Sequence, residues 1–480
     1  MTAAPLRNAM PVRNPRTGDI DFHITPASAE EVAAVARRLR EAQVAWGHAP
    51  VEHRIAVMQR WAEVIRAHRQ AIIDADAADT GYGQISQIAP DMMLGAIFGG
   101  SRGAAAAFEQ ARRQGTSPNM PHVRYDSVLK PFPLVGVISP WNAPTMLSML
   151  HVIPPLFAGC AVMLKPSEVT PRFTKPLMDT VREVPELAAI FDVVLGDGET
   201  GQAVVENADL ISFTGSVGNG RKVAEACARR FIPAELELGG KDPLVVTASA
   251  DLDKAVTAAV RGALTSSGQV CFSIERIYVQ ESVHDAFVEK LVKKAGQVQV
   301  NHPDPMKGQL SPFIFHRQAE IVADHLADAV AKGAKVWTGG EVLNLDGGLY
   351  MQATVLTDVT HDMKVMQDET FGPVLPVMRY TTEDEAVRLA NDTFFGLSAA
   401  VMAGTEDEAR RIGAQINAGN VSLQDCFLTF AAGAAEADSF GASGVGMKRP
   451  GIQRYFKRQA LLTNTLDPAD LVEDGLKAAE

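Results

Sequence analysis

Short, uninterrupted apolar runs alternate with amphipathic segments through the middle of the chain. We expect strands at residues 134–139, 161–165, 191–195 and 210–214. We expect the intervening helices at residues 145–157, 171–183, 199–207 and 217–230. Buried strands joined by helical crossovers are typical of a parallel sheet covered on both faces. The pattern therefore predicts a doubly wound α/β sheet in this region.

The regions on either side follow different patterns. The first hundred residues carry apolar positions at helical spacing, and Ser28 ahead of Glu30 and Glu31 indicates a capped helix start. A second series of α/β elements is expected over residues 244–428, and residues 467–480 form a polar tail. At 480 residues the chain is long enough for two or three domains.

One apolar stretch requires a decision between membrane and core. No charged residue occurs between Lys130 and Lys165, and hydropathy alone would allow a membrane span there. The stretch is interrupted by Pro140, Pro144, Pro154 and Pro155. We therefore interpret it as a strand, a loop and a buried helix, and expect no membrane partner.

Composition narrows the class of protein. Asp and Glu number 57 against 45 Lys and Arg, and the resulting charge of −12 argues against a nucleic-acid partner. Four cysteines are too few for a disulfide framework and lack zinc-site spacing, so we expect no metal and a reducing compartment. The N-terminus lacks the apolar segment of a signal peptide. We therefore expect a cytoplasmic enzyme or binding protein.

Two polar turns follow predicted strands at the sheet edge where α/β proteins bind ligands. Residues 213–220, Phe-Thr-Gly-Ser-Val-Gly-Asn-Gly, lead into a helix whose free N–H groups can bind a pyrophosphate. In Leu164-Lys-Pro-Ser-Glu168, Lys165 can meet a ribose hydroxyl or a phosphate. Glu168 can accept hydrogen bonds from an adenosine ribose and would repel a 2′-phosphate. Taken alone, either segment could also be an unliganded turn.

Three further motifs carry chemistry: Pro140-Trp-Asn142, Leu236-Glu-Leu-Gly-Gly-Lys241 and Gly268-Gln-Val-Cys271. With the two turns, they resemble the aldehyde dehydrogenase superfamily over nearly the whole chain. The same resemblance covers Asn14 to Gly18, Glu369-Thr-Phe-Gly-Pro-Val374 and Phe395-Gly-Leu-Ser398. It implies an α/β fold with a Rossmann-type NAD-binding domain, an α/β catalytic domain and a small β oligomerisation arm. The expected bounds are 1–116 and 133–239 for the first, 240–452 for the second, and 117–132 and 453–466 for the arm. A homodimer or homotetramer is implied by the resemblance only.

The resemblance also implies the catalytic residues. Oxidising an aldehyde to an acid requires a nucleophile that forms a tetrahedral adduct able to release hydride, and a thiolate suits this step. Cys271 is the implied nucleophile, and Glu237 is the implied base that activates water to hydrolyse the thioester. The side-chain amide of Asn142 and the backbone N–H of Cys271 would form the oxyanion hole. Family members that transfer the acyl group to coenzyme A typically lack the Glu, so we expect water as the acceptor.

The expected cofactor is NAD, since Glu168 disfavours the 2′-phosphate of NADP. By resemblance, Lys165 and Glu168 contact the adenosine ribose and Ser216 contacts the pyrophosphate. Glu369 would hold the nicotinamide ribose, with Phe371 packed by the ring. The full expected set is Ser139, Trp141, Lys165, Ser167, Glu168, Gly215, Ser216, Gly239, Glu369 and Phe371.

The chain departs from the family pattern at two places. His151 stands where the family often has a Lys, nine residues after Asn142. It could relay protons near neutral pH, or it could be a packed core histidine. The motif at residues 440–446 is shorter than usual, so the loop 426–439 beside the substrate tunnel has no clear counterpart.

The expected substrate is a bulky neutral aldehyde, aromatic or medium-chain aliphatic. Leu150 occupies the position where succinic semialdehyde enzymes place an Arg, and a buried carboxylate without a cation would be costly. One alternative is a semialdehyde dehydrogenase whose anion-binding residue lies in the 426–439 loop. A second is a binding paralogue without catalysis, which would have lost a catalytic residue that this chain retains. The expected substrate-side residues are Met146, Leu147, Leu150, His151, Val270, Phe272 and Phe427.

Overall fold

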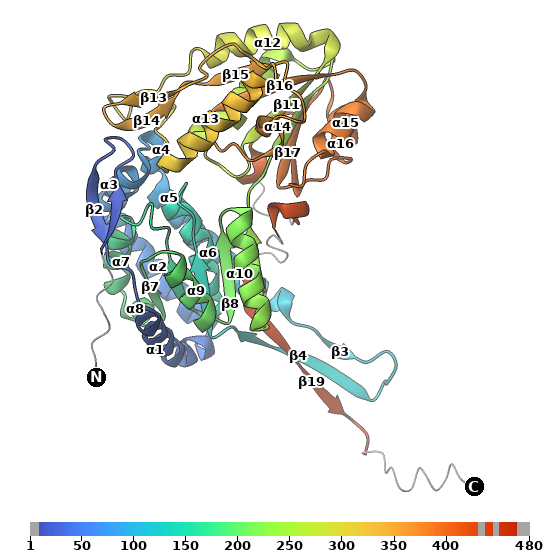
Figure 1. Ribbon diagram of the computed structural model, residues 1–480. Coiled ribbons are helices and arrows are strands. Elements are labelled where there is room, and N and C mark those ends of the chain that lie inside the picture. Colours follow the sequence, from blue (N-terminus) through green and yellow to red (C-terminus); the bar gives the residue numbers. More distant parts are fainter. Residues whose placement is uncertain (1–8, 431–436, 445–450, 468–480) are drawn as a thin grey trace.

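The computed structural model describes residues 9–430, 437–444 and 451–467. Two largely parallel sheets form the lower and upper parts of the molecule in Figure 1, and a narrow β arm projects from the lower part. The predicted α/β fold class is confirmed. The predicted polar tail lies, from residue 468 onward, outside the described residues.

The lower sheet has five parallel strands, and three of them are buried along their whole length because their residues are almost all apolar. Strand β5 lies at the centre of the sheet. From β5 the chain continues through β6 and β7 on one side, and then crosses to β8 and β9 on the other. The order is β7 (Phe191–Val193), β6 (Ala161–Lys165), β5 (Leu134–Ile138), β8 (Leu210–Thr214) and β9 (Ala234–Glu237).

Helices before and between these strands bury the apolar faces of the sheet in one large hydrophobic cluster. Ser28 and Glu31 form the capping box that the sequence indicates at the start of the first helix. The N-terminal helices are α1 (Ala29–His48), α2 (Val51–Ala67), α3 (Arg69–Thr80), α4 (Gln84–Gln87) and α5 (Ala89–Ala111). The crossover helices are α6 (Pro144–Ala158), α7 (Thr174–Arg182), α8 (Pro185–Ile190), α9 (Gly198–Asn207) and α10 (Val217–Arg229).

Helix α6 accounts for most of the uncharged stretch. It begins at Pro144, where the missing N–H costs nothing, and ends before Gly159, whose φ of 97° suits a glycine. It is buried against α5 and α2. Within the described ranges, we find no helix whose length and apolar character would let it cross a membrane.

The upper sheet has seven strands, all parallel except β12, which pairs antiparallel with β15. The order is β12 (Lys335–Val336), β15 (Thr354–Thr357), β16 (Val374–Tyr380), β11 (Ile274–Gln280), β10 (Asp242–Val246), β17 (Ser398–Met402) and β18 (Asn420–Leu423). Its helices are α11 (Leu252–Leu264), α12 (Glu281–Ala295), α13 (His316–Ala331), α14 (Lys364–Gln367), α15 (Glu383–Asn391) and α16 (Glu406–Gly413). Two hydrophobic clusters cover its faces.

The arm is a three-stranded antiparallel sheet that stands apart from both larger sheets (Figure 1). Strand β4 (Val123–Pro131) pairs over its whole length with β19 (Phe456–Asn464) and briefly with β3 (Gln114–Thr116). Strand β3 lies just before the segment 117–132 that the sequence analysis assigned to the arm. Residues Leu461 and Leu462 are exposed on β19.

Two short hairpins have no counterpart in the sequence-based prediction. One pairs β1 (Met10–Arg13) with β2 (Ile20–Ile24), and the other pairs β13 (Val342–Leu345) with β14 (Gly348–Met351). Most residues of these strands are partly exposed or fully exposed, so they lack the continuous apolar run that marked the buried strands. In the N-terminal region, the helical periodicity of the residues after β2 led to a prediction of helices alone.

Candidate active site

A cavity of about 400 Å³ lies at the C-terminal edge of the lower sheet, where the upper sheet faces it. Open α/β sheets bind ligands at this edge, at the point where the strand order reverses. Here the reversal lies between β6 and β8, on either side of β5. All ten residues expected to contact the cofactor line the cavity, together with Asn142, Leu147 and Cys271.

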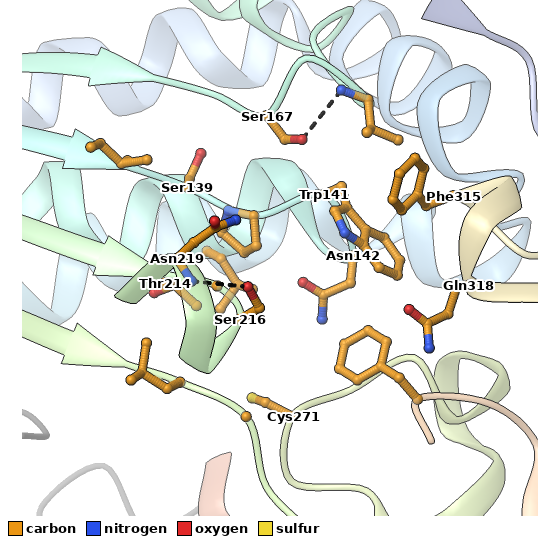
Figure 2. A pocket seen from close by; sticks show the side chains of 18 of the residues that line it. Ser139, Trp141, Asn142, Ser167, Thr214, Ser216, Asn219, Cys271, Phe315 and Gln318 are labelled. Atoms are coloured by element: carbon orange, nitrogen blue, oxygen red, sulfur yellow. Dashed lines mark hydrogen bonds between the residues drawn. The ribbon is translucent and has the colours of Figure 1, made fainter. Parts of the chain in front are cut away.

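The Gly-rich turn after β8 opens directly into α10, and the N-terminal end of this helix, which favours anions, lies at the cavity. Ser216 caps the helix, and its Oγ accepts the N–H of Asn219 at 3.4 Å (Figure 2). A side chain at Gly220 would collide with Leu238, because a Cβ there would lie 2.4 Å from it. The glycine thus permits close packing of helix and strand, while Ser216 and Asn219 face the cavity.

The turn after β6 brings a cation and an anion to the same wall. Lys165 is 5% exposed, and its Nζ donates to Glu168 Oε2 at 2.9 Å. Ser167 Oγ accepts the N–H of Val169 at 3.2 Å, which fixes the turn (Figure 2). The pair supplies both a donor and an acceptor for a sugar hydroxyl.

The segment before Cys271 has an unusual backbone. Ser266, Ser267 and Gly268 all adopt left-handed conformations, with φ between 53° and 72°. For serine this costs about 1–2 kcal/mol per residue. A Cβ at Gly268 would lie 2.2 Å from the carbonyl oxygen of Gly372, so only glycine fits.

Side chains on both sides of Gly268 hold this backbone. Ser267 Oγ donates to the Ser311 carbonyl at 3.1 Å and accepts the Ser311 N–H at 2.7 Å. The side-chain oxygen of Gln269 accepts the N–H of Ile314 at 3.0 Å, and its Nε2 donates to Pro312 O at 3.2 Å. The nucleophile loop is therefore attached to the segment that leads into α13.

Asn142 connects the lower sheet to this loop. Its side chain is 6% exposed, and Nδ2 donates to the Gln269 carbonyl at 2.9 Å. Since an amide carries two N–H bonds, this contact orients the group and leaves the second hydrogen for another acceptor. In Figure 2 the side-chain amide of Asn142 is drawn above Cys271, and both residues line the cavity. This arrangement suits an oxyanion donor.

The surroundings of Cys271 are acidic. Burial raises the pKa of its thiol, and the nearby carboxylates of Glu369, Glu237 and Asp242 raise it further. A hydrogen bond from the backbone N–H of Cys271 lowers the pKa of the thiol, so this donor lies beside the sulfur. Glu237 ends β9 and is near enough to influence the thiol, although it does not line the cavity. The thiol of the cofactor-free chain is therefore protonated at neutral pH.

An aromatic wall closes the other side of the cavity. The ring of Trp141 lies edge-on to Phe371 at 5.3 Å and near Phe315 at 6.0 Å. Beside it, Glu369 Oε1 accepts the N–H of Gly240 at 3.2 Å, and burial and the charge of Glu275 raise the pKa of Glu369 to about 8. A Cβ at Gly239 would lie 2.5 Å from that carboxylate, so the wall is closely packed here.

Several lining residues were missed by the sequence analysis. Asn219 lies inside the Gly-rich motif and could have been found there. Phe315, Arg317, Gln318 and Ile321 come from the start of α13, where no motif marked the sequence. Gln318 Nε2 donates to Thr370 O at 2.8 Å, and Arg317 forms no ion pair with any residue that the structure describes.

The seven residues expected on the substrate side do not all lie at the cavity. Leu147 lines the cavity, whereas the other six lie outside its lining. Leu150 is 36% exposed, and the rings of Phe272 and Phe427 pack at 4.6 Å. His151 is buried, its Nε2 lies 2.9 Å from Thr214 Oγ1, and burial lowers its pKa to about 3. A neutral, packed histidine fits this geometry better than a proton relay.

Comparisons with known proteins identify the family. Residues 2–461 match the model of the aldehyde dehydrogenase family, and the chain belongs to this family of oxidoreductases. The predicted family and enzyme class are confirmed.

Three known proteins illustrate the similarity. A putative aldehyde dehydrogenase, PutA, from Anabaena variabilis is 44% identical with a TM-score of 0.94, over 97% of this chain and 99% of that one. A putative succinate-semialdehyde dehydrogenase [NADP(+)] from Mycolicibacterium smegmatis is 38% identical over 96% of this chain and 90% of its own length. Betaine aldehyde dehydrogenase from Staphylococcus aureus, solved with NAD+, is 28% identical with a TM-score of 0.89, over 97% and 93% of the two chains.

The residues present fit a nicotinamide dinucleotide. Such a cofactor needs an anion site for its pyrophosphate, polar groups for two riboses and a flat apolar wall for the nicotinamide. The start of α10, the Lys165–Glu168 pair and Glu369 supply the polar groups, and the aromatic wall supplies the flat surface. The cavity volume is in the usual range for ligand pockets, about 300–1,000 Å³.

The oxyanion geometry predicts the effect of Asn142→Ala. Turnover should fall roughly 10²- to 10³-fold, because one of the donors to the developing oxyanion is lost. Binding of the reduced cofactor, measured by fluorescence titration, should stay near the wild-type value. Near-native turnover in this variant would contradict the role of Asn142.

The acidic setting of Cys271 predicts slow alkylation of the cofactor-free chain. Because the pKa of the thiol is raised, its thiolate fraction should increase about tenfold per pH unit up to pH 9.5, where an ordinary thiol with pKa ~8.5 is already close to its plateau. The iodoacetamide rate should be measured from pH 7 to 9.5, with Cys271→Ala as the control for the three buried cysteines. A rate that levels off at or below pH 9.5 would contradict the raised pKa.

Proposed function

We propose that the protein oxidises an aldehyde to its carboxylic acid with a nicotinamide cofactor, using Cys271 as the nucleophile. One observation carries the proposal: Cys271, Asn142 and all ten expected cofactor residues line one cavity. The three groups come from different parts of the chain and from both sheets. A binding paralogue without catalysis would have no need for this combination.

The residues divide the work as follows. Glu237 takes the proton of the Cys271 thiol and passes it to solvent. The thiolate then adds to the carbonyl carbon, and the amide of Asn142 and the N–H of Cys271 stabilise the resulting oxyanion. NAD, when bound, accepts the hydride that leaves this carbon. The thioester left on Cys271 is attacked by water whose proton passes to Glu237. The acid then leaves, and the sulfur is released as thiolate.

We propose NAD rather than NADP as the physiological cofactor. Glu168 stands beside Lys165 at the wall expected to hold the adenosine ribose, and its charge opposes a 2′-phosphate. The betaine aldehyde dehydrogenase structure contains NAD+, which agrees, whereas the name of the Mycolicibacterium smegmatis relative specifies NADP(+). Arg317 adds a positive charge to the lining on the α13 side, where it can meet a cofactor phosphate.

We propose a bulky neutral aldehyde as the substrate. Leu147, the member of the expected substrate-side set that lines the cavity, is apolar and offers no charge to a carboxylate. The packed rings of Phe272 and Phe427, next to Cys271 in the chain or against that neighbour, offer none either. Residues 426–439 contain no Lys, Arg or His, which removes the simplest cation for the semialdehyde alternative. The name of the Mycolicibacterium smegmatis relative favours that alternative, and the hydroxyl groups of this loop are its remaining anion ligands.

We also propose the assembly and setting that the sequence analysis expected. The arm, with exposed leucines on β19, would join a neighbouring copy in a homodimer or homotetramer. The two sheets would serve as cofactor and catalytic domains with the expected bounds. Four cysteines without disulfides support a reducing, cytoplasmic setting.

The cofactor proposal predicts a preference that depends on Glu168. Wild type should show a higher kcat/KM with NAD than with NADP, and Glu168→Gln should reduce the ratio roughly tenfold or more, since removing one repulsive charge is worth on the order of 1–2 kcal/mol. Glu199→Gln, on the exposed start of α9, is the matched control. A wild-type preference for NADP would overturn the assignment.

The substrate proposal predicts the order of activities in an aldehyde panel. Benzaldehydes and hexanal should give NADH at 340 nm with higher kcat/KM than succinic semialdehyde or betaine aldehyde, because burying an unpaired charge is costly. Cys271→Ala should abolish every activity. Highest activity on succinic semialdehyde would keep the chemistry but replace the substrate class.

A further inference from the structure

A buried carboxylate on the strand that follows the nucleophile has no part in the chemistry above. Glu275 is the second residue of β11, four residues beyond Cys271, and is 3% exposed. It does not line the cavity. Its carboxylate accepts Lys241 Nζ at 2.6 Å, the N–H of Thr370 at 2.7 Å and the N–H of Phe371 at 2.7 Å.

The two N–H groups belong to the loop that places Glu369 and Phe371 on the cavity wall. Phe371 has a φ of 53°, a left-handed conformation that is rare for an aromatic residue. Both oxygens of Glu275 are directed at this strained backbone, one at each N–H. Without them, one buried and one partly buried donor would lose their partner, and the loop would lose the contact that favours its conformation.

Other contacts position the same loop from other sides. Lys241, 1% exposed, also donates to Thr370 Oγ1 at 2.9 Å and so joins Glu275 to the loop a second time. Gln318 Nε2 donates to Thr370 O, which connects the loop to α13. Glu275 differs from these in accepting two successive backbone N–H groups, those of Thr370 and Phe371, and so it fixes the chain on both sides of the peptide that joins them.

We propose that Glu275 is a positioning residue for the nicotinamide half of the cofactor. It holds the Thr370–Phe371 backbone so that Glu369 and Phe371 are presented to the nicotinamide ribose and ring. Because β11 begins three residues after Cys271, the same carboxylate sets the cofactor wall relative to the nucleophile. This inference rests on the proposed function, since it takes a nicotinamide cofactor as the ligand.

The experiment compares two substitutions at Glu275 with one matched control. Glu275→Gln keeps an acceptor oxygen but loses the charge. Glu275→Asp keeps the charge, but its side chain is one methylene shorter, so the carboxylate lies farther from the N–H groups of Thr370 and Phe371. Asp79→Asn is the control, because Asp79 is also a buried carboxylate that accepts a cation, Arg172 at 2.9 Å, and a backbone N–H, that of Phe173 at 3.2 Å. Asp79 lies on α3 and does not line the cavity.

Three quantities are measured on each full-length variant: the NADH dissociation constant by fluorescence, the alkylation rate of Cys271 without cofactor, and Tm. Glu275→Gln should weaken NADH binding roughly tenfold to a hundredfold, as expected when a binding group is misplaced, and Glu275→Asp should have a smaller effect in the same direction. The alkylation rate should remain within about twofold of wild type, since the nucleophile loop has its own supports. Asp79→Asn should lower Tm and leave NADH binding unchanged.

Native NADH binding in both Glu275 variants, with Tm lowered as in Asp79→Asn, would overturn the proposal and leave Glu275 a purely structural residue. If Glu275→Gln does not fold, Glu275→Asp decides alone, because it retains the buried charge pair with Lys241. A wild type that binds NADPH more tightly is titrated with NADPH instead. A wild type that binds neither cofactor would remove the proposed function together with this inference, whereas native binding in the variants removes this inference only.

Discussion

The hydrogen bond from Asn142 Nδ2 to the carbonyl of Gln269, 2.9 Å long, is the contact on which the site depends. It joins the loop after β5 in the lower sheet to the loop that carries Cys271 in the upper part of the molecule. Each sheet alone provides only part of the proposed chemistry: the lower one would supply the anion site and the oxyanion amide, and the other would supply the thiol. A direct bond between the two loops keeps the amide and the sulfur on facing sides of one cavity.

That geometry requires strained backbone conformations and buried acidic groups, and both cost free energy of folding. Two serines and a glycine before Cys271 are left-handed, and Phe371 is left-handed in the adjoining loop, whose Gly372 packs against Gly268. Side chains that accept or donate to these backbones offset the strain locally. Burial, and after it the nearby acidic groups, raise the pKa of the Cys271 thiol in the free chain, and an oxidised nicotinamide would bring a positive charge to this setting. The same carboxylates that restrain the free thiol thus suit a cationic cofactor.

The sequence predicted the buried parts of this structure well because burial leaves a clear pattern. Strands β6 and β8 have the expected bounds, and α6, α9 and α10 begin or end within one residue of them. Motifs located the site because glycine, asparagine and cysteine are required there by geometry or chemistry. The short exposed hairpins left no such pattern, and neither did the first turn of α13, whose Arg317 and Gln318 reach the cavity only through the tertiary fold. Leu150 was expected at the substrate side from the family resemblance, and the structure leaves it 36% exposed, outside the cavity lining.

The central claim is that the aldehyde carbon becomes covalently bound to Cys271 and is released by water that Glu237 activates. Mass spectrometry of acid-quenched protein, mixed with NAD and a turned-over aldehyde, tests this directly. The account predicts that Glu237→Gln accumulates an acyl adduct on the peptide containing Cys271, at the mass of the thioester, and that Cys271→Ala forms none. An adduct on another residue, or turnover in Glu237→Gln at the wild-type rate with no adduct, would contradict it.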